Sequence, residues 1–239
     1  MSQETLYGII LRTVKYSDNS LIVTAYTKEN GLRSYMVRGI HSRTSKAKVN
    51  YFQSLAFLKF MAATSKNDRL SHIKEVMAVK SFTQELTPTK NLIAVFLQEI
   101  LVKTLREEEP HPEIVEFLET AFKLFQLKEG SCANFHLVFM LKFTQLLGFP
   151  PMDNYSNANP FFSLGDGKFL AHKPINGHFL DEEVSSVFHQ LLGVNLAESE
   201  SIPLNQSQRK KLLNTIIHYY QFHHALAGEI TSLSVLEQL

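Results

Sequence analysis

Cysteine is almost absent from this chain of 239 residues, which contains only Cys132. A single thiol excludes a disulfide framework and any metal site built from four thiolates. No apolar run approaches the roughly 20 residues that a membrane-spanning helix needs, and the first residues do not resemble a signal peptide. We therefore expect a globular cytoplasmic protein, because 44% apolar residues are enough to form substantial cores.

The common catalytic motifs are also missing. The sequence contains no Gly-x4-Gly-Lys-Ser/Thr loop, no Gly-x-Gly-x-x-Gly, no Gly-x-Ser-x-Gly and no His-Glu-x-x-His. Cys132 and His136 are four residues apart on a predicted helix, but their stripe is strongly apolar, so we interpret both as core residues. His218, His223 and His224 do not have metal-ligand spacing on one helical face. The sequence predicts neither an enzyme nor a cofactor.

Charge is distributed unevenly along the chain. Residues 1–80 contain 13 Lys and Arg and 5 Asp and Glu, a net charge of +8, although the whole chain carries only +1. The remaining residues therefore have a net charge of −7. Such asymmetry indicates a module that binds a polyanion, joined to a domain of another kind.

The first 80 residues have the apolar alternation of β-strands. Segments with a period of two, rich in β-branched and aromatic residues, are residues 6–14, 20–27, 32–37, 52–60 and 70–79. The pair Asn30-Gly31 predicts a tight hairpin turn. Five short strands fit an OB-type barrel better than a β-sandwich, which needs seven or more.

From Pro88 onward the period becomes helical. Helices are predicted at residues 88–105, 112–128, 131–148, 181–192, 207–226 and from 228 to the end. Residues 151–178 lack periodicity, and the turn sequence Gly165-Asp166-Gly167 predicts a hairpin there. The predicted fold class is α+β and multidomain. A five-stranded OB-type β-barrel (1–80) precedes a mainly α-helical domain (81–239) with a small irregular or hairpin insert.

Basic residues in the predicted barrel are interleaved with aromatic ones. This combination lets a groove follow phosphates while bases stack on rings. A single exposed Lys or Arg is an ordinary solvated residue. So many of them in one barrel are unusual and indicate a binding surface. We predict a DNA-binding surface formed by Arg12, Lys15, Arg33, Tyr35, Arg38, Arg43, Lys46 and Lys48.

Several segments resemble the bacterial recombination mediator RecO. Its amino-terminal barrel is similar to YGIILRT (7–13), YSDNSLIV (16–23), TKENGL (27–32) and VRG (37–39). Its later helices are similar to FHL (135–137) leading into LLGFPP (146–151), and to GEITSLSVL (228–236). The order and spacing of these segments agree over nearly the whole chain.

The resemblance implies a nucleoid-associated DNA repair and recombination protein that is not an enzyme. It would bind single- and double-stranded DNA, anneal complementary strands coated by single-strand binding protein, and with RecR help to load RecA. Many members of that family have two Cys-x-x-Cys pairs that bind zinc. This chain has YSNA (155–158) and FLAH (169–172) instead, so we predict no zinc.

The resemblance also implies that the helical domain binds the acidic tail of single-strand binding protein, which ends in phenylalanine. Such a tail needs an apolar slot for the ring and cations for its carboxylates. We predict this site in the helices at 112–128 and 131–147, from Phe117, Lys123, Leu124, Lys128, Leu141 and Lys142.

Two other functions are compatible with the sequence. An OB-fold adaptor could bind a protein or RNA without annealing DNA, because this fold hosts many ligands. An unrecognised hydrolase could use the insert. Binding and annealing assays would distinguish these alternatives from a recombination mediator.

Overall fold

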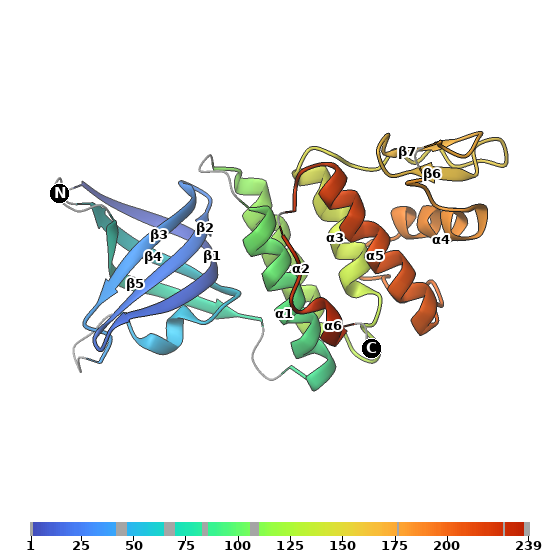
Figure 1. Cartoon of the computed structure of the whole chain (residues 1–239). Helices are drawn as coiled ribbons and strands as arrows, with labels where there is room; N and C mark the ends of the chain where they lie inside the picture. The colour runs from blue at the N-terminus through green and yellow to red at the C-terminus, as the bar shows by residue number, and fades with distance from the viewer. Residues whose placement is uncertain are drawn as a thin grey trace. The chain divides into compact units, whose positions relative to one another are not determined.

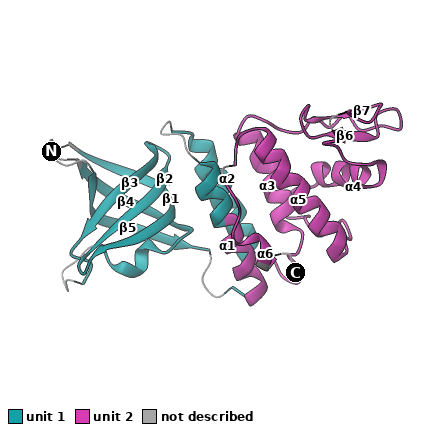
Figure 2. Cartoon of the chain, in the orientation of Figure 1, with its two compact units in different colours: residues 1–87, 98–126 teal, residues 88–97, 127–239 magenta. Residues whose placement is uncertain are grey.

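The computed structural model describes residues 2–41, 47–64, 70–82, 86–105, 110–175, 177–226 and 228–236. The chain forms two compact units (Figure 2). Unit 1 comprises residues 1–87 and 98–126, and unit 2 comprises residues 88–97 and 127–239. Helix α1 (Pro88–Thr104) therefore contributes to both units. None of the described helices has the length and apolarity needed to cross a membrane.

Five strands of unit 1 form a closed barrel in the order β1-β2-β3-β5-β4 (Figure 1). Its strands are β1 (Ser2–Ser17), β2 (Ser20–Thr27), β3 (Gly31–Arg38), β4 (Ala56–Thr64) and β5 (Ser71–Ser81). All neighbouring strands are antiparallel except β3 and β5, which are parallel. The predicted OB-type barrel followed by helices is confirmed.

Alternation of apolar residues determines which face of each strand enters the barrel. On β2, Leu21, Val23 and Ala25 all belong to the barrel core, as expected for side chains two residues apart on one face. Gly8 of β1 lies so close to β2 that a Cβ atom would be 2.1 Å from the carbonyl oxygen of Tyr26. Only glycine allows the two backbones to approach so closely at this position.

The fourth strand begins later than the sequence predicts. Phe52, which was expected to start it, is instead the last residue of a short helix, η1 (Val49–Phe52), and is buried in the barrel core at 2% exposure. Leu55 then has a positive φ of 66°, and its backbone N–H donates to the carbonyl of Ile10 at 2.7 Å. This turn directs the chain into β4. An apolar residue that fills the core from a helical turn was mistaken for a strand residue.

Helix α2 (Pro112–Leu127) belongs to unit 1 with the barrel. One side of it is apolar and buried, with Ile114, Val115, Leu118, Ala121, Phe122 and Phe125. Two glutamates on α2 form ion pairs with barrel lysines: Lys28 with Glu116 and Lys80 with Glu119, each at 2.6 Å.

Unit 2 is built around α3 (Phe135–Leu146), which is apolar on nearly every side and buried, as expected for a central helix. It contacts both α4 (Glu182–Gly193) and α5 (Gln206–Phe222). Each of these helices has a side-chain cap: Asp181 accepts from the backbone N–H of Val184 at 3.0 Å, and Asn205 forms a capping box with Gln208. The last helix, α6 (Leu233–Leu236), is a single turn.

The predicted hairpin insert is present in unit 2. Strands β6 (Phe161–Ser163) and β7 (Lys168–Leu170) are antiparallel. Phe162 contacts the rings of Phe169 and Phe188, with centroids 5.0 and 4.5 Å away. Aromatic packing therefore joins the hairpin to α4. A polar contact lies nearby, where His189 bonds to Asp153 through Nδ1 at 2.5 Å.

Candidate nucleic-acid interface

The outer surface of β1, β2 and β3 is the candidate interface in unit 1. Thr24 pairs with Ser34 between β2 and β3, and their hydroxyls are hydrogen-bonded at 3.0 Å on the outer face. The next residues in register, Val23 and Tyr35, point into the core. In OB-type barrels this outer face and the adjoining loops are the part that binds oligonucleotides.

Tyr35 does not lie on that outer face. Its side chain is 1% exposed, and its ring packs edge-on against Phe60 at a centroid distance of 5.3 Å. Burial also raises the pKa of its phenol. This position corrects our prediction of Tyr35 as a DNA contact, because the alternation of β3 directs residue 35 into the core.

Arg12 and Arg38 do lie on the outer face. Arg12 is in register with Thr24 on β2, and Arg38 is in register with Ser20. Both arginines are exposed, and neither guanidinium group has an ion-pair or hydrogen-bond partner within the part of the chain that the structure describes. Their guanidinium groups are available to an anion.

Lys15 and Arg33 are placed less favourably for that face. Lys15 pairs with Asp18 at 2.8 Å beside the turn between β1 and β2, although this exposed pair is readily broken. Arg33 is exposed but pairs with Ala25 near the β2–β3 turn, at the opposite end of β3 from Arg38. A single ligand must therefore extend along the strands to contact Arg33 and Arg38 together.

The segment after β3 returns to the β1–β2 turn. The backbone N–H groups of Gly39 and His41 donate to Asn19, at 2.9 Å to its carbonyl and 3.2 Å to its side chain. Lys48 is exposed immediately before η1. The same segment contains two predicted contacts that lie outside the described residues, Arg43 and Lys46.

Tyr16 is one of the aromatic residues interleaved with the basic ones in the predicted barrel, although the predicted contacts did not include it. Tyr16 is 66% exposed at the end of β1 that leads into the β1–β2 turn. Alternation alone gives Tyr16 the parity of Val14, and only the bulge between Lys15 and Ser17 redirects its ring. Alternation therefore identifies Tyr35 as a core residue but does not identify Tyr16 as a surface one.

Two barrel lysines are already engaged within unit 1. Lys28 and Lys80 lie 5.9 and 5.7 Å from the centre of the Tyr7 ring, and both pair with glutamates of α2. Burial, together with the Glu119 carboxylate, raises the pKa of the Tyr7 phenol. Burial would also raise the pKa of Glu119, but Lys80 and Tyr7 hold it below its ordinary value. The net charge of the first 80 residues thus overstates what is available to a ligand.

The residues of the predicted tail site are divided between the two units. Leu141 is 2% exposed in the core of unit 2. Lys128 and Lys142 donate to the backbone carbonyls of Ala197 and Leu192. Burial lowers the pKa of Lys142. Unit 1 contains the other three residues, half-buried Phe117 and Leu124 and exposed Lys123.

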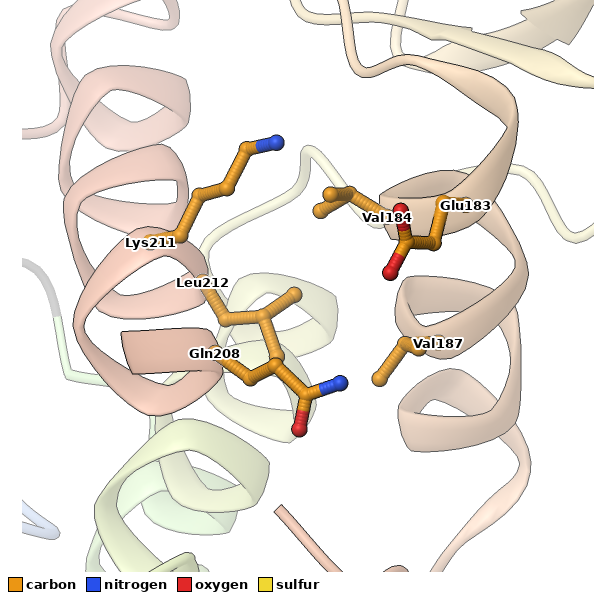
Figure 3. Close-up of a pocket in the computed structure, with 6 residues that line it drawn as sticks. All are labelled: Glu183, Val184, Val187, Gln208, Lys211 and Leu212. Carbon is orange, nitrogen blue, oxygen red and sulfur yellow. The ribbon is translucent and has the colours of Figure 1, made fainter. Parts of the chain in front are cut away.

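Hollows in the described part of unit 2 include a slot and a groove. Val184, Val187 and Leu212 line a slot between α4 and α5, with charged side chains at its edge (Figure 3). Its cavity of about 30 Å³ holds no more than a water-sized molecule. The second is an open groove of about 480 Å³ beside His178, His218, Gln221, Phe222 and His224. Across the described residues, no group of three His, Cys, Asp or Glu side chains could hold a metal ion.

Comparison with known proteins agrees with the fold. Residues 1–82 match the family model described as recombination protein O N terminal, and residues 85–228 match recombination protein O C terminal. The chain belongs to the RecO family. A DNA repair protein RecO of Phocaeicola vulgatus is 33% identical over 240 residues, covering 100% of this chain and 99% of that protein. One of Flavobacterium psychrophilum is 33% identical over 234 residues, covering 97% of each.

RecO membership supports a role for this chain in DNA repair. The similarity to these relatives extends over both units, because a more distant RecO from Azobacteroides pseudotrichonymphae, at 26% identity, also covers 97% of the chain. An OB-like barrel with an exposed basic face is consistent with that role.

Proposed function

We propose that this chain is a recombination mediator that binds single- and double-stranded DNA through the outer face of β1–β3. It anneals complementary strands and, with RecR, helps to load RecA onto DNA coated by single-strand binding protein. One observation carries the proposal: Arg12 and Arg38 are exposed on one face of an OB-like barrel, with no partner in the described part of the chain. This role needs no catalysis and is exercised at the nucleoid.

Binding of this kind is mainly electrostatic and largely independent of base sequence. Cations that neutralise phosphates release counterions, so affinity falls as salt rises. The face offers arginines and hydroxyl groups, such as those of Thr24 and Ser34, rather than a helix that could enter the major groove. Such a surface suits a protein that must act on any damaged sequence.

The test is the salt dependence of single-strand binding by the triple variant Arg12→Ala, Arg38→Ala, Lys48→Ala. On single strands, log K falls with log salt by about 0.7 per phosphate contact, so the slope should flatten by roughly 2. Lys59→Ala, an exposed cation on β4, is the matched control and should keep the full slope. A triple variant with the wild-type slope would exclude these residues as contacts. Adding Arg43→Ala and Lys46→Ala then tests the segment outside the described residues.

The proposed partners need separate tests. We expect the wild-type chain to be required for annealing of complementary strands coated by single-strand binding protein. We also expect it to be required for RecA filament formation, measured with and without RecR. Fluorescence anisotropy with the acidic tail peptide should show weaker binding for Lys123→Ala, because this exposed lysine has the freedom to meet a carboxylate. Unchanged tail affinity for Lys123→Ala, Lys128→Ala and Lys142→Ala would show that the tail binds at another site.

A protein-binding adaptor is the second candidate. Met77 and Val79 on β5 are 55% and 39% exposed, and exposed apolar side chains on one strand favour a protein ligand. An adaptor without mediator activity would bind a partner protein and fail to anneal DNA. The annealing assay therefore separates the two candidates.

A further inference from the structure

Tyr16 differs from every other tyrosine of the chain in its exposure. The chain has eight tyrosines, all within the described residues, and Tyr16 alone is exposed, at 66%. Tyr26, Tyr219 and Tyr220, for comparison, are at most 1% exposed. The Tyr16 side chain makes no hydrogen bond or ring contact with any described residue. Its large apolar ring therefore remains in solvent without a structural role in unit 1.

The local backbone explains why this ring is not packed. Lys15 pairs with Leu21 and Ser17 pairs with Ser20, so Tyr16 is the extra residue of a bulge in β1. A bulge releases one residue from the regular alternation and redirects its side chain, and bulges are frequent beside binding sites. The bulge thus presents the ring at the rim of the barrel.

Cationic and polar groups surround this end of the barrel. Ser17, Ser20 and Arg38 lie in one register row across β1, β2 and β3. Neighbouring strands are about 4.8 Å apart, so the backbone of Arg38 is two strands away from the bulge. His41 is held at the same end by its bond to Asn19. An aromatic ring and a guanidinium are therefore close enough to contact one nucleotide and its phosphate.

We propose that Tyr16 is the base-stacking residue of the outer face and makes this face prefer single-stranded over duplex DNA. The inference rests on the proposed function, because it assigns a substrate preference to the same surface. Arg12 and Arg38 attract the phosphates of either form of DNA. The Tyr16 ring distinguishes the two forms, because unpaired bases can stack on it whereas paired bases are enclosed within the duplex.

The experiment compares three variants at position 16 by anisotropy with single-stranded and duplex DNA of equal length. Loss of a base–aromatic stack lowers affinity by roughly fivefold to a hundredfold. Tyr16→Ala should therefore lose at least fivefold on single strands and less than twofold on duplex. Tyr16→Phe should retain wild-type affinity, because stacking needs no hydroxyl. The salt slope of Tyr16→Ala should equal that of wild type, since no phosphate contact is lost.

Tyr16→Trp provides a direct readout, because the chain contains no tryptophan. Its emission should be quenched when a single strand is added and stay unchanged with duplex at saturation. Phe222→Trp, at the other exposed aromatic ring (38% exposed), is the matched control and should not be quenched. Circular dichroism should show both variants folded, since both sites are exposed.

The outcomes separate this inference from the proposed function. A wild-type chain that binds no DNA overturns the proposed function. A wild-type chain that binds single strands, with equal affinity in Tyr16→Ala and an unquenched Tyr16→Trp, overturns the stacking role alone. Equal losses on single strands and duplex would also overturn it, because stacking cannot account for them.

Discussion

In unit 2, Lys128 and Lys142 donate to backbone carbonyls at 2.9 and 2.7 Å, whereas on the barrel Arg12 and Arg38 extend into solvent. The lysines of unit 2 satisfy carbonyls that would otherwise lack a partner, including one in the last turn of α4. A cation used in this way is held in place by the carbonyl and has fewer donors left for a ligand. Residue type alone therefore does not identify a binding surface.

The two units also differ in how their interiors are packed. In the barrel, aliphatic residues at alternate positions fill much of the core around the ring pair of Tyr35 and Phe60, and backbones come close, as at Gly8. In unit 2, rings pack against rings, as Phe162 does against Phe169 and Phe188. The hairpin of unit 2 contains no cysteine, and its aromatic rings pack against one another and against α4.

The largest expected effect tests this aromatic packing. Phe162→Ala removes a ring that is 0% exposed and contacts two others. We expect a loss of about 3–5 kcal/mol in the free energy of unfolding, measured by chemical denaturation. Phe222→Ala, at an exposed ring, should cost less than about 1 kcal/mol. A chelator should leave the wild-type melting temperature unchanged, and one zinc per chain by elemental analysis would contradict this account.

The next effect tests the close approach of the β1 and β2 backbones at Gly8. In Gly8→Ala the new Cβ would lie 2.1 Å from a backbone carbonyl oxygen that cannot move without shifting β2. We expect a loss of about 3 kcal/mol or more, observed as a lower denaturation midpoint. The control is Gly165→Ala in the hairpin turn, where a Cβ would meet no atom within 4 Å. Similar stabilities for the two variants would show that the barrel can relax around position 8.

The barrel and its strands were predictable because alternation is a local property of the sequence. The start of β4 was not, since Phe52 enters the core from a short helix and the positive φ of Leu55 then turns the chain into the strand. The surface was only partly predictable. Arg12 and Arg38 lie where expected, but Tyr35 is in the core and Tyr16 is outside because of a bulge. A bulge depends on two strands, so a single segment does not reveal it.

The tail site was less predictable than the barrel. The acceptors of Lys128 and Lys142, at Ala197 and Leu192, are 69 and 50 residues away in sequence. Helical periodicity places these lysines on a surface but says nothing about a carbonyl from a distant segment. Leu141 was expected to line an accessible apolar slot. It is buried instead, because α3 is surrounded by other elements and buries nearly all of its residues.

A third prediction concerns the pH dependence of unit 2. Burial lowers the pKa of His136 from 6.5 to about 3, and its Nδ1 has no hydrogen-bond partner among the described residues. The unfolded chain therefore binds a proton below pH 6.5 that the folded chain excludes, so stability falls as pH falls from 6.5 toward 3. The slope from this group is at most about 1.4 kcal/mol per pH unit. His136→Phe should reduce the slope of unfolding free energy between pH 6 and 4, whereas exposed His218→Asn should not.

The smallest effect tests the comparison of cations directly, in the pair Lys142→Ala and Arg38→Ala. Lys142→Ala leaves the carbonyl of Leu192 without its charged donor at the end of α4, which should cost about 1 kcal/mol of unfolding free energy. Arg38→Ala removes an exposed side chain and should change stability by less than about 0.5 kcal/mol. DNA binding should show the opposite order, because only Arg38→Ala removes a proposed phosphate contact, which should flatten the salt slope on single strands by about 0.7. Lys142→Arg, which keeps a donor at that position, should recover most of the lost stability. If Lys142→Ala weakens DNA binding while Arg38→Ala does not, then the DNA contact is Lys142 and not Arg38, and this account of the two cations is wrong.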